Sequence, residues 1–283
     1  MLFLLLLVSY CDKVTHFPCM TPVFHRKIDT FTLNINHFPM RIIEVCCSSL
    51  SEAREAAAGG ARRIELCAAI TCGGVTPSYG VIKAIAEAGL DIDINVLIRP
   101  REGGFCYSDD EVATMCRDIE FCRSVGIHGV VIGALTADGD IDLEACRRMM
   151  DAAGNLSVTF HRAYDVCRNP KEALEQIISL GCDRLLTSGQ QPTAEAGTEF
   201  LSKLVEQAAG RIIIMPGAGV NPQNIAYIEQ KTAATEFHST AAINDPDSAY
   251  RGANVSFAAY PDREGVIRHS SREVVLQLVN NTL

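Results

Sequence analysis

Apolar residues recur along the chain in short runs, each followed by a polar loop and then by a longer amphipathic stretch that ends at or near a glycine. Short apolar runs bounded by turn residues are typical of buried strands, and a three-to-four-residue period is typical of helices. The runs predict eight strands, at 42–45, 64–66, 94–98, 130–132, 156–160, 184–186, 212–215 and 235–237. A helix follows each strand, near 49–58, 79–88, 108–125, 142–153, 170–180, 198–209, 222–231 and 272–280. Eight such units predict an α/β protein with a single (β/α)8 TIM barrel.

Residues 1–39 do not follow this pattern. Residues 2–8 form an apolar run that is too short to span a bilayer and lacks a preceding positive charge. We interpret residues 1–39 as an N-terminal extension outside the domain, an upstream artefact with Met40 as the natural start. Residues 40–283 are then the barrel domain. A weak signal peptide is the alternative interpretation of the same segment.

Composition narrows the function classes. The 283 residues are 48% apolar and 21% charged, which excludes a disordered chain. A net charge of −9 with dispersed basic residues argues against a nucleic-acid partner, and we expect no membrane partner. Three of the twelve cysteines, Cys116, Cys122 and Cys146, fall within helical patterns, so we expect reduced thiols and a cytoplasmic protein.

The loops place the site. Links from helix to strand are short, whereas links from strand to helix are long and rich in Gly, Pro and charge. Function in such barrels lies at the C-terminal ends of the strands. Residues 239–270 form the longest of these loops, for which we expect irregular structure beside the barrel mouth.

Strand alternation predicts which side chains face inward. Thr159 and His161 share one face of their strand, while Val158 and Phe160 share the other. The same rule gives an inner set of Glu44, Cys46, Glu65, Cys67, Asn95, Arg99, Thr159, His161, Thr187, Glu236 and His238. These polar residues predict either a binding or catalytic site, or an ion-pair network that only stabilises the barrel.

One functional hypothesis is an enzyme that acts on a small anionic metabolite, phosphorylated or carboxylated. His161 would transfer a proton, with Glu65 or Asp165 fixing its tautomer. Arg99 would hold the anion through two parallel hydrogen bonds. Glu44 and His238 complete the candidate catalytic set.

A glycine stretch at 215–220 follows the seventh predicted strand and precedes a helix. The backbone amides of Gly217 and Gly219 are candidates for anion binding at this position. A tight turn without a ligand is the alternative.

The second hypothesis uses sulfur. Cys46 and Cys67 each follow an inner glutamate by two residues on adjacent strands, so two thiols can meet at the mouth. Paired thiolates suit Cu(I), which would then be the cofactor or cargo. Cysteines also pack as small apolar side chains, which is the alternative interpretation. Cys47 and Cys72 are nearby substitutes, and we expect Cys106 to be exposed.

Several short segments resemble the CutC family in order along residues 41–238. They are RIELC (63–67), GGVTPS (73–78), IRPR (98–101), GAL (133–135) with DG (138–139), FHRA (160–163) with Asp165, LTSG (186–189) and TEFH (235–238). The resemblance implies a cytoplasmic TIM-barrel protein of copper homeostasis that forms a homo-oligomer, a dimer. The copper-binding cysteines of the family correspond to Cys46 and Cys67. The chain differs from the family pattern in its first 39 residues and in its cysteine-rich helices.

Overall fold

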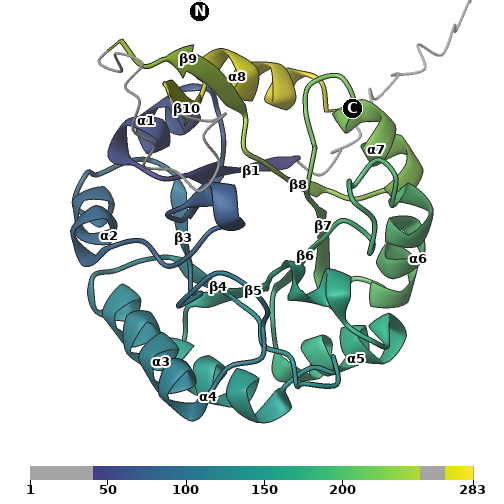
Figure 1. The fold of residues 1–283 in the computed structure, drawn as a ribbon. Coiled ribbons are helices and arrows are strands. Elements are labelled where there is room, and N and C mark those ends of the chain that lie inside the picture. The colour runs from purple at the N-terminus through teal and green to yellow at the C-terminus, as the bar shows by residue number, and fades with distance from the viewer. Residues whose placement is uncertain (1–40, 249–264, 283) are drawn as a thin grey trace, which may run out of the picture. The chain divides into compact units, whose positions relative to one another are not determined.

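The computed structural model describes residues 41–248 and 265–282, which form a ring of parallel strands enclosed by helices (Figure 1). Hydrogen bonds connect the eight barrel strands in the order β7-β6-β5-β4-β3-β2-β1-β8, and β8 lies against β7 to complete the ring. The predicted (β/α)8 barrel is therefore confirmed. The barrel strands are β1 (Ile42–Cys47), β2 (Arg63–Leu66), β3 (Asp93–Leu97), β4 (Gly129–Ile132), β5 (Ser157–Phe160), β6 (Arg184–Thr187), β7 (Ile213–Pro216) and β8 (Glu236–Ser239). The helices are α1 (Leu50–Ala58), α2 (Tyr79–Ala86), α3 (Asp109–Ser124), α4 (Leu143–Ala153), α5 (Pro170–Leu180), α6 (Thr198–Ala208), α7 (Ile225–Thr232) and α8 (Arg272–Asn280), with short 3-10 helices η1 (Ile70–Cys72) and η2 (Arg162–Val166).

Local signals set the helix boundaries. Ser108 and Glu111 form a full capping box at the start of α3, which satisfies two backbone N–H groups that have no partner in the helix. Pro170 opens α5, and Gly181 ends it in the left-handed conformation at φ 86°. At α1 only half of a capping box forms, because the Glu52 carboxylate accepts from Ser48 instead of from Ser49.

Alternation along the strands separates two environments. Apolar outer residues such as Val45 and Ile64 pack against the helices in the main core, while the inner positions carry the predicted polar side chains. The prediction was wrong at β6, where Leu186 lines the interior and Thr187 faces outward. Thr187 is buried there because its hydroxyl donates to the Asp165 carboxylate, which supplies the partner that a buried polar group needs.

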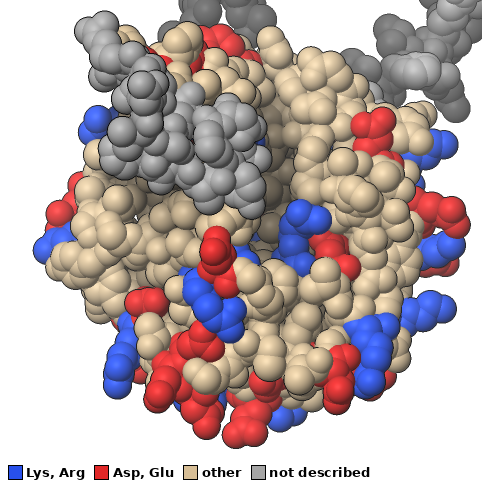
Figure 2. Space-filling view, in the orientation of Figure 1, with Lys and Arg blue, Asp and Glu red and all other residues tan. Residues whose placement is uncertain are grey.

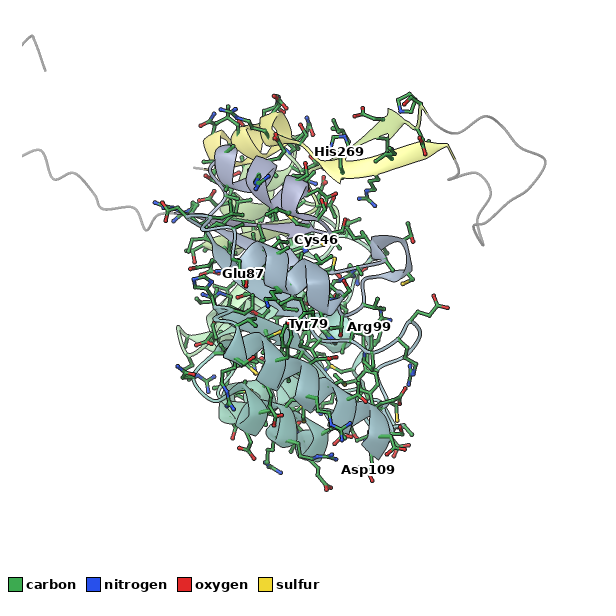
Figure 3. The ribbon with its side chains drawn as sticks, turned by 90° about the vertical axis from the view of Figure 1, so that its left-hand side faces the viewer. Cys46, Tyr79, Glu87, Arg99, Asp109 and His269 are labelled. Atoms are coloured by element: carbon green, nitrogen blue, oxygen red, sulfur yellow. The ribbon has the colours of Figure 1, made fainter. Side chains whose placement is uncertain are left out.

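The loop after β8 is not wholly irregular. Two of its segments, β9 (Ala242–Pro246) and β10 (Val266–Ser270), pair as an antiparallel hairpin. The Ser270 hydroxyl donates to the main-chain oxygens of Cys46 and Thr240, which ties the base of the hairpin to β1. In the side view, Arg99 and the hairpin lie toward the mouth of the barrel, and Glu87 lies toward the opposite end (Figure 3). Within residues 41–248 and 265–282, none of the helices combines the length and hydropathy needed to cross a membrane.

Candidate functional site

A cavity of about 320 Å³ opens at the C-terminal ends of the strands. The face that carries the mouth is hollowed near its centre, with basic side chains beside the hollow (Figure 2). Backbone register brings the lining together: Cys46 pairs with Glu65 across β1 and β2, and Glu44 pairs with His238 across β1 and β8. The charged, imidazole and thiol side chains that line the cavity are Cys46, Glu65, Cys67, Arg99, His161, Arg162, His238 and Arg268.

Below the cavity lies a buried ion-pair network. The Arg63 guanidinium donates to Glu44 and to Glu236, and Arg184 also donates to Glu236 at 2.7 Å. Burial alone would raise the pKa of Glu44, but Arg63 and His238 outweigh burial and lower it to about 2. The stabilising network considered as an alternative from the sequence therefore exists at this level, and Glu44 belongs to it.

His238 connects this network to the cavity. Its Nδ1 lies 2.8 Å from Glu44 Oε1, and its Nε2 lies 3.7 Å from Glu65 Oε2. Burial lowers the pKa of His238, but the carboxylates of Glu65 and Glu44 more than compensate, so the pKa is raised overall. The His238 imidazole thus lies between Glu44, which belongs to the ion-pair network, and Glu65, whose carboxylate is on the cavity floor.

The two predicted thiols meet on that floor. The Sγ atoms of Cys46 and Cys67 are 3.1 Å apart, and a Glu65 carboxylate oxygen lies within 4.8 Å of both. Leu97 and Val131 pack beside the two cysteines and exclude water from one side. The pKa of Cys46 is raised well above its usual value, first by its contact with Cys67 and then by burial. Burial also raises the pKa of Glu65. The arrangement is a pair of soft donor atoms in which the Cys46 thiol holds its proton more tightly than an ordinary thiol.

His161 lies on the cavity wall and is 5% exposed. Its Nδ1 accepts a hydrogen bond from the Ala163 backbone N–H, so the ring proton is on Nε2. The expectation that Glu65 or Asp165 fixes the tautomer was wrong, because a backbone amide does so. Burial, followed by the charge of Arg99, lowers the pKa of His161 to about 3. The imidazole is therefore neutral and presents an N–H group.

Asp165 lies outside the cavity lining, in η2. Its carboxylate accepts hydrogen bonds from the hydroxyls of Thr187 and Ser188, from the backbone of Ser188 and Gln190, and from Arg162 Nε. These bonds hold the loop after β6 in place and leave the carboxylate fully engaged. Asp165 is thus a loop-positioning residue in this structure.

Arg99 is also largely engaged. Its Nη1 donates to the main-chain oxygens of Cys72 and Gly74, and its Nη2 donates to Gly103. The guanidinium lies over the Phe105 ring at 5.1 Å. Arg99 thus joins the loop that contains Cys72 and Gly74 to the loop that contains Gly103. Nε of Arg99 keeps no partner among the described residues. For the expected pair of parallel bonds to an anion, Arg99 therefore retains Nε–H and one Nη2 hydrogen.

In the glycine stretch after β7, one candidate residue is engaged within the protein and the other lines the cavity. The amide of Gly217 donates to Thr187 O, so it is not free to bind a ligand. A β-carbon at Gly217 would lie 2.5 Å from Leu186 Cδ1, which explains why a side chain does not fit there. Gly219 does line the cavity, with φ at +76°.

Sequence reasoning missed four arginines. Arg63 and Arg184 lie on inner strand positions, and alternation from Glu65 back to Arg63 is the signal that could have identified the first. Arg162 and Arg268 reach the cavity rim. Arg268 belongs to β10, which no pattern in the sequence had predicted. As expected, Cys106 is exposed; Cys47 instead faces the helices in the main core.

Comparisons with known proteins agree with the fold and with the segments noted above. The model of the CutC family matches residues 41–243. A family protein CutC from Parabacteroides distasonis is 56% identical over 216 residues, which cover 76% of this chain and 89% of the relative. Another from Bacteroides thetaiotaomicron is 52% identical over 214 residues, 75% of this chain and 86% of the relative.

Solved structures give the same picture. A structure from Streptococcus agalactiae, described as a proposed copper homeostasis protein CutC, aligns with a TM-score of 0.68 and 35% identity over 71% of this chain and 99% of its own. Thiamine phosphate pyrophosphorylase from Pyrococcus furiosus aligns with a TM-score of 0.53 but only 17% identity, over 86% of this chain and 95% of its own, so it shares the fold alone.

Proposed function

The chain belongs to the CutC family, and on that premise we propose that it serves copper homeostasis by binding Cu(I) as cargo through Cys46 and Cys67. The observation that carries the proposal is the pair of sulfur atoms, 3.1 Å apart on the cavity floor. Soft thiolates are the ligands that Cu(I) prefers, and the two strands already hold both sulfurs on one face.

Entry of the ion requires two local changes. Both thiols must lose their protons, which is costly for Cys46 because its pKa is raised. The sulfurs must also move apart to roughly 4.5 Å, if metal–thiolate bonds are near 2.3 Å and in line. A rotation of either cysteine side chain toward the cavity supplies this movement without changing the strand ladder. Glu65 is the nearest further donor, but its oxygen is a harder ligand than sulfur.

The test is a titration of the reduced protein with Cu(I) in competition with a chelator. The Cys46→Ser, Cys67→Ser double variant should lose the tight site. A matched Cys106→Ser, Cys116→Ser double variant changes two thiols outside the cavity lining and should keep wild-type affinity. Equal affinities for the wild type and the Cys46, Cys67 double variant would remove copper from these positions.

Two further parts of the proposal are the compartment and the assembly. We place the protein in the cytoplasm, because the ten described cysteines are all free thiols, as a reducing compartment keeps them. We propose a homo-oligomer, a dimer by family resemblance. Cell fractionation and light scattering of the purified protein measure these two properties.

A further inference from the structure

Two buried N–H groups at the cavity have no acceptor among the described residues. They are Nε2 of His161 and Nε of Arg99, on side chains that are 5% and 6% exposed. A buried donor without an acceptor loses the hydrogen bond that water gave it, at substantial cost. Both side chains line the cavity, and the Phe105 ring lies 5.0 Å from His161 and 5.1 Å from Arg99. The wall is therefore built to meet an acceptor that enters from the cavity.

The charge around the cavity is opposite to that of the chain. The protein has a net charge of −9, yet the cavity lining contains three arginines and one carboxylate, that of Glu65. Arg162 and Arg268 are the exposed members of this set, on the loop after β5 and on β10. Arg162 is paired with the Asp165 carboxylate. Arg268 makes one described hydrogen bond, to Thr240 Oγ1, and its side chain lines the cavity. A lining of this sign attracts anions into the mouth.

The size of the cavity sets the class of ligand. A volume of about 320 Å³ is far larger than a single metal ion needs, and it falls at the small end of pockets for organic ligands. The apolar side chains of Ile70, Leu97 and Leu186 also line it. An occupant that suits this lining has an uncharged body and at least one anionic oxygen group.

We propose that this wall is a binding site for a small organic oxyanion, a carboxylate or a phosphate ester. His161 Nε2–H is its deep hydrogen-bond donor, and Arg268 is its cationic donor at the rim. A neutral imidazole suits this role, because the low pKa of His161 keeps the ring as a donor with one fixed N–H through the neutral range. The site lies in the same cavity as the two thiols, but its donors are nitrogen atoms and its ligand needs no metal.

Isothermal titration calorimetry in metal-free buffer tests the site with three probes: inorganic phosphate, citrate and glycerol 3-phosphate. We expect citrate, glycerol 3-phosphate or both to bind more tightly than inorganic phosphate, because only these have an organic body. Glycerol 3-phosphate has no carboxylate and citrate has no phosphate, so binding of the first alone assigns the phosphate ester and binding of the second alone assigns the carboxylate. The absence of binding by all three at millimolar concentration would overturn the proposal.

Variants locate the site. Arg268→Ala removes an exposed side chain and should raise the Kd of the best probe roughly tenfold or more, the factor that a lost charge-assisted hydrogen bond gives. The matched control is Arg148→Ala, because Arg148 pairs with Asp109 on the outer helices, and its Kd should equal that of the wild type. Equal weakening by both variants would show that only general charge matters, against the proposal.

His161 needs two variants because it is buried. His161→Leu removes the donor and should weaken binding, whereas His161→Gln keeps an N–H group close to the position of Nε2 and should retain most of the affinity. Thermal melts of both variants check that they fold. If His161→Gln folds and binds no better than a folded His161→Leu, or if His161→Leu keeps wild-type affinity, His161 is not the deep donor.

Discussion

A β-carbon on Gly133 would lie 2.5 Å from both Cε1 and Nδ1 of His161. The glycine at the end of β4 and the histidine at the end of β5 therefore share one volume, which only the imidazole fills. Because position 133 has no side chain, the His161 ring fits on the inner wall of the barrel without displacing β4.

Gly133→Ala should accordingly destabilise the protein by about 1–3 kcal/mol, the usual cost of adding a methyl group to a packed interior. It should also move the His161 ring, because the backbone on both sides is fixed by strand pairing. The free energy of unfolding in urea measures the first effect. Gly80→Ala is the control: nothing lies within 4 Å of the added carbon on α2, so stability should stay equal or rise. A Gly133→Ala variant with the unfolding free energy of the wild type would contradict this prediction, because the His161 ring could then move aside at little cost.

The free energy of unfolding should decrease in acid because Glu44 then becomes protonated. Its folded pKa of about 2 lies below its ordinary value of 4.5, so the stability that it contributes is complete above pH 4.5 and is lost as the pH falls toward 2. Glu44→Gln should lower the free energy of unfolding by about 3–5 kcal/mol at pH 7, because it leaves Arg63 with one carboxylate fewer. Its unfolding free energy should then change less between pH 5 and pH 3 than that of the wild type. Glu55→Gln, on the exposed face of α1, should keep the wild-type slope.

Copper affinity should rise with pH. Because Cys46 holds its proton more tightly than an ordinary thiol, Cu(I) must displace that proton. The apparent Kd should decrease about tenfold per pH unit for each proton released, between pH 6 and pH 8. The competition titration, repeated at several pH values and corrected for the chelator, measures this slope. An affinity that does not change with pH would contradict thiol coordination.

The N-terminal segment gives a prediction outside the described residues. Residues 1–39 show no helical or strand period in the sequence, and we expect them to lie outside the barrel domain. Truncation to Met40 should change the melting temperature by no more than a few degrees, as expected when less than about 1 kcal/mol is lost. Thermal unfolding of the two forms makes the comparison. A large loss of stability would show that the segment packs on the domain.

The sequence predicted those features that depend on a period. Two-residue alternation placed Glu44, Cys46, Glu65 and Cys67 on the inner face, because strand geometry leaves only two directions for a side chain. It could not foresee that Thr187 would turn outward, since that depends on the Asp165 carboxylate arriving from another loop.

The sequence did not predict the contacts that depend on loop geometry. The Nη groups of Arg99 bind main-chain oxygens of two loops, and the Gly217 amide binds Thr187 O. Loop main-chain positions have no sequence period, so these engagements were not predictable. Arg268 reaches the rim only because β9 and β10 pair into a hairpin that brings the chain back over the mouth.

The bond from Ser270 to the main-chain oxygen of Cys46 joins residues 224 positions apart. Directly after it, α8 packs Val275 against Gly59, where an added β-carbon would lie 2.6 Å away. During synthesis, the first strand therefore acquires these neighbours only after the segment up to Val275 has left the ribosome. The order of translation thus delays completion of the barrel around Cys46, and contacts at such sequence separation also slow the final closure of the barrel.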